Sequence, residues 1–137
     1  MPISPPKEHL ASFPGDPDQI RAVRRFVADA LGPGHPRAAD AILLVSEIAT
    51  NAVRHTSSAG AAFDVAVAPT RDSARITVRD AGGSTIPCGC RIRRNATGGR
   101  GLALVETIAN SWGFTRAGTA TAVWFELAPE DERFEAY

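Results

Sequence analysis

The sequence lacks several features that define whole classes of protein. It carries no net charge, because fifteen basic residues balance fifteen acidic ones, so no overall field draws it toward nucleic acid or an anionic membrane. No apolar run approaches the ~20 residues that cross a bilayer, and the N-terminal stretch MPISPPKEHL lacks the apolar core of a signal peptide. Nucleic acid and membranes are therefore not expected as partners, and a cytoplasmic location is expected.

Cysteine is scarce as well. Only Cys88 and Cys90 occur, two positions apart in a stretch rich in glycine, proline and arginine. A zinc site commonly takes four ligands from paired Cys-x-x-Cys units or histidines, and no second pair exists. Metal binding at these residues is the alternative, but two free cytosolic thiols are the favoured interpretation.

The length predicts a single domain. A chain of 137 residues can bury roughly two-thirds of its unfolded surface in one core. We expect a flexible segment or edge strand at residues 1–12, one domain at 13–128 and a charged tail at 129–137. Neither an internal repeat nor a linker divides the chain.

Two helices are predicted in the first half of the chain. Asp16 can cap the first helix and Pro17 suits its first position, and apolar residues then recur at helical spacing as far as Leu31. The stretch GPGHP at 32–36 breaks that helix. A longer second helix is expected from about Pro36 to Thr56.

Strands are predicted from residue 61 onward, where the apolar period changes from helical to two. Residues 63–67 and 75–80 form a credible hairpin around the turn at 71–73. A third helix is expected after Gly101, followed by strands at 111–115 and 121–127. Helices and strands that do not strictly alternate favour an α+β layered domain over a doubly wound parallel sheet.

The second helix carries a line of polar residues. Glu47, Asn51 and Arg54 stand at i, i+4 and i+7, so they project from nearly one line, with core-type residues on the other side. A solvent-facing stripe is the common explanation for such a line. Leu43 and Leu44 continue it one turn earlier, however, which favours the wall of a pocket.

Asp80 and Thr121 extend apolar strand faces. By alternation, Asp80 shares a face with Ile76 and Val78, and Thr121 shares one with Val123. A buried carboxylate needs hydrogen-bond partners. The sequence leaves open the alternative that the strand has already ended and that Asp80 is a turn residue.

A glycine-rich segment, GGRG at 98–101, opens the third helix. The free N–H groups of a helix N-terminus and the helix dipole bind anions, and Arg100 adds a charged donor. The segment is neither a Walker P-loop nor a dinucleotide-binding fingerprint. A plain tight turn is the alternative.

The possible roles of these residues fit together if all of them bind one ligand, Mg·ATP. The amide of Asn51 suits Mg²⁺, which takes its remaining ligands from water and phosphates. Glu47 can accept a proton from the group that attacks the terminal phosphate. Asp80, an acceptor when ionised, fits the exocyclic amine of adenine, and Thr121 can support that carboxylate or a bridging water.

Four motifs occur in an order that resembles the GHKL ATPase superfamily. They are E-x-x-x-N at Glu47 and Asn51, D-x-G at Asp80, G-x-G at Gly99 and a threonine at 121. Within it, the stretches FPGDP, VSEIATNAVRHT, VRDAGG, GRGLALVETIANSWG and TAVWFEL look like the anti-sigma-factor serine/threonine kinases. The likeness is to the actinobacterial ATP-binding regulators of that group and runs from about Phe13 to Leu127.

The resemblance implies a Bergerat fold, a two-layer α/β sandwich whose mixed, mainly antiparallel sheet is covered on one face by helices. It implies that Glu47 is the general base, that Asn51 holds Mg²⁺ and that Asp80 binds adenine. The remaining nucleotide-binding residues that it implies are Gly82, which allows close approach, the phosphate-binding Gly99, Arg100, Gly101 and Leu102, then Arg54 and His55 beside the site, and Thr121.

The implied function is a protein serine/threonine kinase that phosphorylates a STAS-type anti-anti-sigma partner and regulates transcription by sequestering a sigma factor. The alternative is a non-catalytic, nucleotide-dependent module that sequesters a sigma factor or STAS protein. Family likeness also allows a homodimer, although no sequence feature demonstrates one. The chain departs from the family pattern at Asp80–Ser84, where the second glycine of D-x-G-x-G is displaced, and at Ala120, where many members have glycine.

Overall fold

The computed structural model describes residues 7–55, 62–80, 100–117 and 120–129. Its elements follow one another along the chain in the order β1 (His9–Phe13), a short 3-10 helix η1 (Pro17–Gln19), α1 (Ile20–Leu31), α2 (Ala38–His55), β2 (Phe63–Pro69), β3 (Ala74–Asp80), α4 (Arg100–Ile108), β4 (Ser111–Ala117) and β5 (Ala120–Leu127). No helix in these ranges is long and apolar enough to span a membrane.

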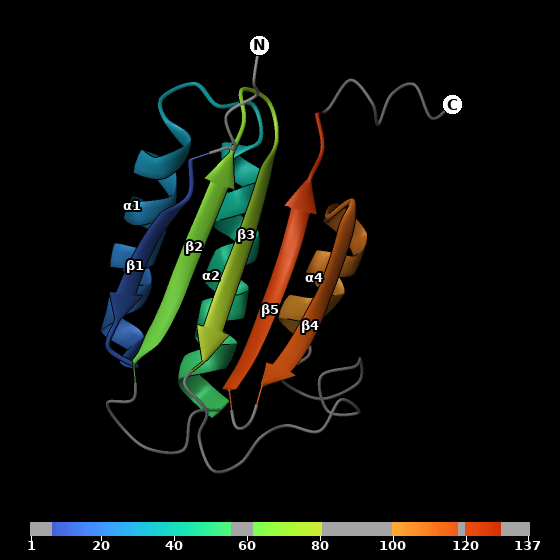
Figure 1. Ribbon diagram of the computed structural model, residues 1–137. Helices are drawn as coiled ribbons and strands as arrows, with labels where there is room; N and C mark the ends of the chain where they lie inside the picture. Colours follow the sequence, from blue (N-terminus) through green and yellow to red (C-terminus); the bar gives the residue numbers. More distant parts are fainter. Residues whose placement is uncertain (1–6, 56–61, 81–99, 118–119, 130–137) are drawn as a thin grey trace.

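The strands form one five-stranded sheet in the order β1-β2-β3-β5-β4 (Figure 1). The predicted hairpin is confirmed: β2 and β3 pair antiparallel, from Pro69 opposite Ala74 to Phe63 opposite Asp80. β4 and β5 also pair antiparallel, as do β1 with β2 and β3 with β5. Every ladder between the described strands is therefore antiparallel.

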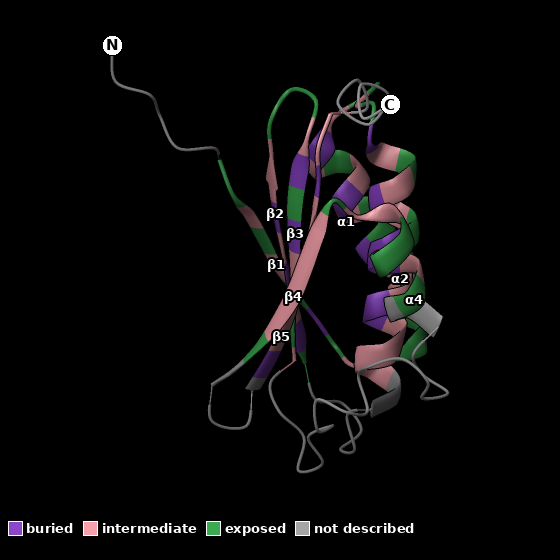
Figure 2. Cartoon of the chain, turned by 90° about the vertical axis from the view of Figure 1, so that its right-hand side faces the viewer, coloured by how far each residue is buried: buried purple, intermediate pink, exposed green. Residues whose placement is uncertain are grey.

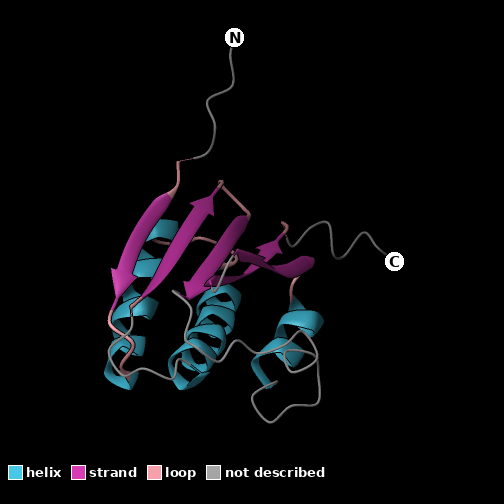
Figure 3. Cartoon of the chain, turned by 60° about the horizontal axis from the view of Figure 1, so that its bottom comes forward, coloured by secondary structure: helices cyan, strands magenta, loops and turns pink. Residues whose placement is uncertain are grey.

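The helices α1, α2 and α4 all lie on one face of this sheet (Figures 2 and 3). α1 lies behind β1 and β2, α2 behind the centre of the sheet, and α4 behind β5 and β4 (Figure 1). The predicted α+β class and two-layer sandwich are confirmed by this arrangement.

The hydrophobic core lies between the two layers. α1 contributes residues four apart, Val23, Val27 and Leu31, because a helix returns to the same face about every fourth residue. The sheet contributes alternate residues, since successive side chains of a strand point to opposite faces. The buried residues of the sheet and of α2 are Phe63, Val65, Val67, Ala74, Ile76, Val78, Phe125, Leu127, Ala41, Leu44, Val45, Ile48 and Ala49.

The two ends of α1 differ from one another in how they are formed. Asp16 has extended backbone before η1, and Pro17 occupies the first helical position as predicted. The Asp16 side chain makes no capping hydrogen bond, however, so its predicted capping role is wrong. At the other end, Gly32 adopts φ +90°, a left-handed conformation that few other residues tolerate, and stops the helix.

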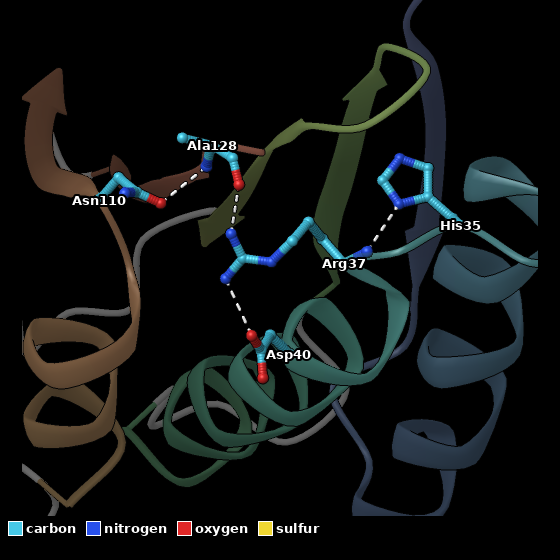
Figure 4. Close-up of polar contacts among 5 residues, drawn as sticks. All are labelled: His35, Arg37, Asp40, Asn110 and Ala128. Carbon is cyan, nitrogen blue, oxygen red and sulfur yellow. Dashed lines mark hydrogen bonds and ion pairs between the residues drawn. The ribbon is translucent and has the colours of Figure 1, made fainter. Parts of the chain in front are cut away.

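A buried arginine joins the start of α2 to the end of β5 (Figure 4). Arg37 is 0% exposed; its Nη2 donates to Asp40 at 2.8 Å, and its Nη1 donates to the carbonyl oxygen of Ala128. The N–H of Ala128 in turn donates to Asn110 Oδ1 at 2.7 Å. Both backbone groups of Ala128 are therefore held by side chains that are distant in sequence.

His35 adds the β2–β3 turn to the same contact. Its Nδ1 accepts from the N–H of Arg37 at 3.0 Å, while its Nε2 lies 3.0 Å from the carbonyl oxygen of Thr70 and 3.2 Å from that of Ser73. Carbonyl oxygens only accept, so this geometry requires the neutral tautomer with its proton on Nε2. The start of α2 is thereby anchored to two different parts of the sheet.

Replacing Arg37 with methionine tests this anchor. Arg37→Met keeps an aliphatic stem but leaves the Ala128 carbonyl without its donor, and we expect a loss of about 2 kcal/mol in the free energy of unfolding. Urea unfolding followed by circular dichroism measures it. Arg25→Met, on the exposed side of α1, is the matched control. It should leave the urea concentration at the midpoint of unfolding unchanged. Equal midpoints for the two variants would contradict the assignment.

Candidate functional site

The polar line of α2 runs along the edge of its buried face. Glu47 and Asn51 are both partly buried, and Ile48 and Ala49 between them are buried in the core. Leu44 is fully buried, whereas Leu43, directly in line with Glu47 one turn earlier, is 42% exposed. The line of residues therefore begins at the exposed Leu43 and continues at the partly buried Glu47, at the edge of the hydrophobic core.

Two neighbouring hydroxyls on α2 are already engaged along the helix. Thr50 Oγ1 donates to the carbonyl oxygen of Ser46 at 2.7 Å, and Ser46 Oγ donates to that of Ile42 at 2.7 Å. Such bonds satisfy the donors of the hydroxyls within the helix itself. The carboxylate of Glu47 and the amide of Asn51, on the same part of α2, are polar groups that this helix can offer to a ligand.

Asp80 and Thr121 are paired across the sheet. β3 continues to Asp80, so the alternative that Asp80 belongs to a turn is wrong. Asp80 stands opposite Thr121 on one side and opposite Phe63 on the other. It shares the inward face with the buried Val78, and Thr121 is only 9% exposed.

Phe63 is a neighbour of the site that sequence reasoning missed. It is 3% exposed and is the cross-strand partner of Asp80. The sequence contained the information needed to predict this contact, because the turn at 71–73 sets the hairpin register that places Phe63 opposite Asp80. An apolar neighbour at this position lowers the local polarity around the carboxylate.

The predicted site elements meet at one end of the molecule. The last turns of α2, the end of β3, the start of β5 and the start of α4 all lie at the lower end in Figure 1. The helices α2 and α4 also contact one another, and α2 packs on β3. The fold thus gathers four chain segments that are far apart in sequence.

For the other predicted site residues, the structure describes either the secondary structure alone or nothing. Arg54 and His55 belong to the last turn of α2, and Arg100, Gly101 and Leu102 to the first turn of α4; the side chains of these positions lie outside the described part of the structure. Gly82 and Gly99 lie wholly outside the described residues, as do Cys88 and Cys90.

The donor set suits magnesium held mainly by a nucleotide. Among the described residues, no group of three or more His, Cys, Asp or Glu side chains could hold a metal ion by itself. Mg²⁺ commonly keeps several waters and takes one or two protein ligands together with substrate phosphates. Asn51, with Glu47 one turn away, fits that requirement.

The sequence matches the histidine kinase-like ATPase domain family over residues 13–127. The match includes all four segments of the site, and the chain belongs to this family. It is a family of ATPase domains, in agreement with the predicted GHKL superfamily. No curated protein matches the sequence.

Solved structures of other proteins are similar to this one, and two of them serve for comparison. The first contains the RsbU and RsbW domains of Rv1364c from Mycobacterium tuberculosis, with a TM-score of 0.66 and 20% identity over 90% of this chain and 32% of that one. The second is the histidine kinase domain of the blue-light-activated histidine kinase from Erythrobacter litoralis EL346, with a TM-score of 0.53 and 25% identity over 88% of this chain and 64% of that one.

The chain corresponds to only part of each of these two proteins. This chain spans about a third of the first structure and less than two-thirds of the second. The likeness to the mycobacterial protein, at 20% identity, shows the fold alone. Both matches agree with the Bergerat-type arrangement of helices on one face of an antiparallel sheet.

Removing the carboxylate of Asp80 tests the role in adenine recognition that the sequence resemblance predicts for it. We expect Asp80→Ala to weaken ATP binding by about tenfold or more, because the amine of adenine loses a charged acceptor. Inosine triphosphate, which lacks that amine, should bind the parent weakly and be affected little by the substitution. Isothermal titration calorimetry measures both affinities.

Asp72→Ala is the matched control for Asp80→Ala. Asp72 is an exposed carboxylate in the β2–β3 turn, at the opposite end of β3. The Asp72→Ala variant should bind ATP with the affinity of the parent. If Asp80→Ala retained the parental preference for ATP over inosine triphosphate, the adenine assignment would be wrong.

Proposed function

We propose that this protein binds Mg·ATP at the end of the sheet where α2, β3, β5 and α4 meet. The observation that carries the proposal is the pairing of Asp80 with the buried Thr121, beside a helix that presents Glu47 and Asn51. Membership of an ATPase domain family supports the choice of nucleotide.

Each described residue has a distinct role in the proposal. Asp80 accepts a hydrogen bond from the exocyclic amine of adenine, and Thr121 supports the carboxylate from the adjacent strand. Asn51 holds Mg²⁺ through its amide oxygen, and the ion supplies charge neutralisation for the phosphates. The first turn of α4, which begins at Arg100, offers its free N–H groups to the phosphates.

The proposed reaction is transfer of the terminal phosphoryl group to a serine of a partner protein. Glu47 accepts the proton of the serine hydroxyl, the serine oxygen bonds to the terminal phosphorus, and the bond to the bridging oxygen breaks to release ADP. The proposed acceptor is a STAS-type anti-anti-sigma protein, and the regulated partner is a sigma factor. The likeness to the anti-sigma-factor kinases supports this choice of partners.

Neutralising Glu47 separates binding from transfer. Glu47→Gln keeps the size of the side chain and cannot accept the proton, so phosphate transfer should fall by about 10²- to 10⁴-fold while ATP affinity is retained. Labelled ATP, Mg²⁺ and candidate STAS proteins provide the assay. Glu106→Gln, an exposed position on α4, should transfer at the parental rate. Transfer by Glu47→Gln at that same rate would exclude Glu47 as the base.

Removing the amide of Asn51 tests its proposed role as a ligand of Mg²⁺. In Asn51→Ala, ATP affinity should no longer increase when Mg²⁺ is added, whereas the parent should show a clear increase. Titrations with and without Mg²⁺ give the ratio of the two affinities. Thr50→Val, at the adjacent position, removes only the hydroxyl bonded within the helix, and we expect it to keep the Mg²⁺ response. If Mg²⁺ raised the ATP affinity of Asn51→Ala as much as that of the parent, Asn51 would not be a ligand of the metal.

The alternative function predicts a different result for the parent. A binding module would retain nucleotide and bind a sigma factor or STAS protein only in its presence, with no phosphorylated product. Partner binding without transfer, in the parent itself, would favour that alternative over the kinase.

A further inference from the structure

The outer surface of the helix layer differs between two neighbouring helices. α2 lies between α1 and α4 (Figure 1) and contacts both of them. α1 presents three exposed arginines, Arg21, Arg24 and Arg25, as is ordinary for the solvent-facing side of an amphipathic helix. The corresponding side of α2 carries uncharged residues instead.

Four residues of α2 form this uncharged side, namely Ala39, Leu43, Ser46 and Thr50. They stand four, three and four positions apart, a spacing that places them on one side of a helix. Ala39 and Leu43 are exposed, and Ser46 and Thr50 are half-buried. We refer to these four residues as the uncharged strip.

The uncharged strip can be covered with little desolvation. The hydroxyls of Ser46 and Thr50 already donate to carbonyl oxygens of the helix, each at 2.7 Å. A partner that covers them leaves neither donor unsatisfied, which removes the main cost of burying a hydroxyl. The other two side chains are apolar, and Leu43 is 42% exposed. The strip is therefore suited to contact with another apolar surface.

The position of Leu43 gives it significance, because a single exposed leucine is common on protein surfaces. Leu43 stands four residues before Glu47, and Cβ atoms at this spacing are roughly 6 Å apart. Depletion of charged side chains also distinguishes the centre of a protein interface from the rest of the surface. The uncharged strip thus lies beside the carboxylate that is proposed to act as the base.

We propose that Leu43 positions the acceptor protein. The inference rests on the proposed kinase function, since a serine that gives its proton to Glu47 brings the protein around it over this turn of α2. An apolar side chain of the acceptor, roughly 6 Å from its serine, packs against Leu43 and the uncharged strip. The substrate class is accordingly a protein whose serine stands beside an exposed apolar side chain.

Leu43 acts through the acceptor and not on the nucleotide. Asn51 stands eight residues further along α2, which is roughly 12 Å at the helical rise per residue. A substitution at Leu43 therefore changes how the acceptor binds, while the site proposed for Mg·ATP keeps its residues. This separation distinguishes Leu43 from Glu47, whose carboxylate meets the reacting hydroxyl.

Steady-state phosphate transfer from ATP to candidate STAS proteins tests the proposal. Leu43→Glu places a charge at the apolar contact, and we expect the KM for the acceptor to rise by about tenfold or more. The kcat at saturating acceptor and the KM for ATP should match those of the parent. Leu43→Met keeps an apolar side chain of similar size and should retain the parental KM for the acceptor.

Leu10→Glu is the matched control, because Leu10 is a second exposed leucine, at 68%. Alternation along β1 from the buried Phe13 places Leu10 on the side of the sheet away from the helices. This variant should keep the parental KM for the acceptor, and circular dichroism confirms that each variant is folded. A parental KM in folded Leu43→Glu, or an equal rise in Leu10→Glu, would overturn the proposal.

Substitutions in the acceptor identify the other half of the contact. The apolar residues around its serine are changed to alanine one at a time, and each variant is assayed with the parent kinase and with Leu43→Ala. At the contacting position the change should raise the KM several-fold with the parent and have little further effect with Leu43→Ala, because the effects of residues in contact are not additive. Additive effects at every position would contradict the contact.

A binding measurement separates failure of this inference from failure of the kinase function. Calorimetry with Mg²⁺ and a non-hydrolysable ATP analogue gives the affinity of the parent and of Leu43→Glu for the same STAS proteins. If the parent binds one of them without transferring phosphate, and Leu43→Glu binds it about tenfold more weakly, the kinase function is wrong and the contact at Leu43 stands. If the parent transfers phosphate but both proteins bind the acceptor equally, only the contact at Leu43 is wrong. A parent that neither binds nor transfers overturns both.

Discussion

The antiparallel ladder between β3 and β5 is the contact on which both faces of the molecule depend. It pairs Asp80 with Thr121 and Ile76 with Phe125 on the side of the helices, and Arg75 with Glu126 on the open side. Successive residues of a strand face opposite ways, so one register sets all of these pairs at once. A slip of one residue would bury Glu126 and expose Phe125. The hydrophobic core therefore enforces the geometry of the candidate site.

The position of α2 is fixed at the end remote from the site. Arg37 and His35 tie its start to Ala128, Thr70 and Ser73, and its apolar face packs on β3. The polar line of Glu47 and Asn51 then follows from helical geometry alone. The anchor and the proposed nucleotide site thus occupy opposite ends of one rigid helix.

Much of the fold was predictable from local patterns. Periods of about four and of two residues located the helices and strands, and the turn at 71–73 set the register of the β2–β3 hairpin. The exposure of Leu43 and the uncapped Asp16 were not predictable, because each depends on where a side chain ends relative to distant elements. For the same reason, alternation alone could not decide whether Asp80 was a strand residue.

By itself, the sequence determined which chemical groups are available and in what order they occur, and this order identified the ATPase family. It also determined the outward rows within each strand. Only the tertiary structure decided that Asp80 meets Thr121, and that Arg75 meets Glu126 beside Trp124. These meetings join segments that are far apart in the chain. Their register is set by the simultaneous burial of many apolar side chains, and no local pattern contains that information.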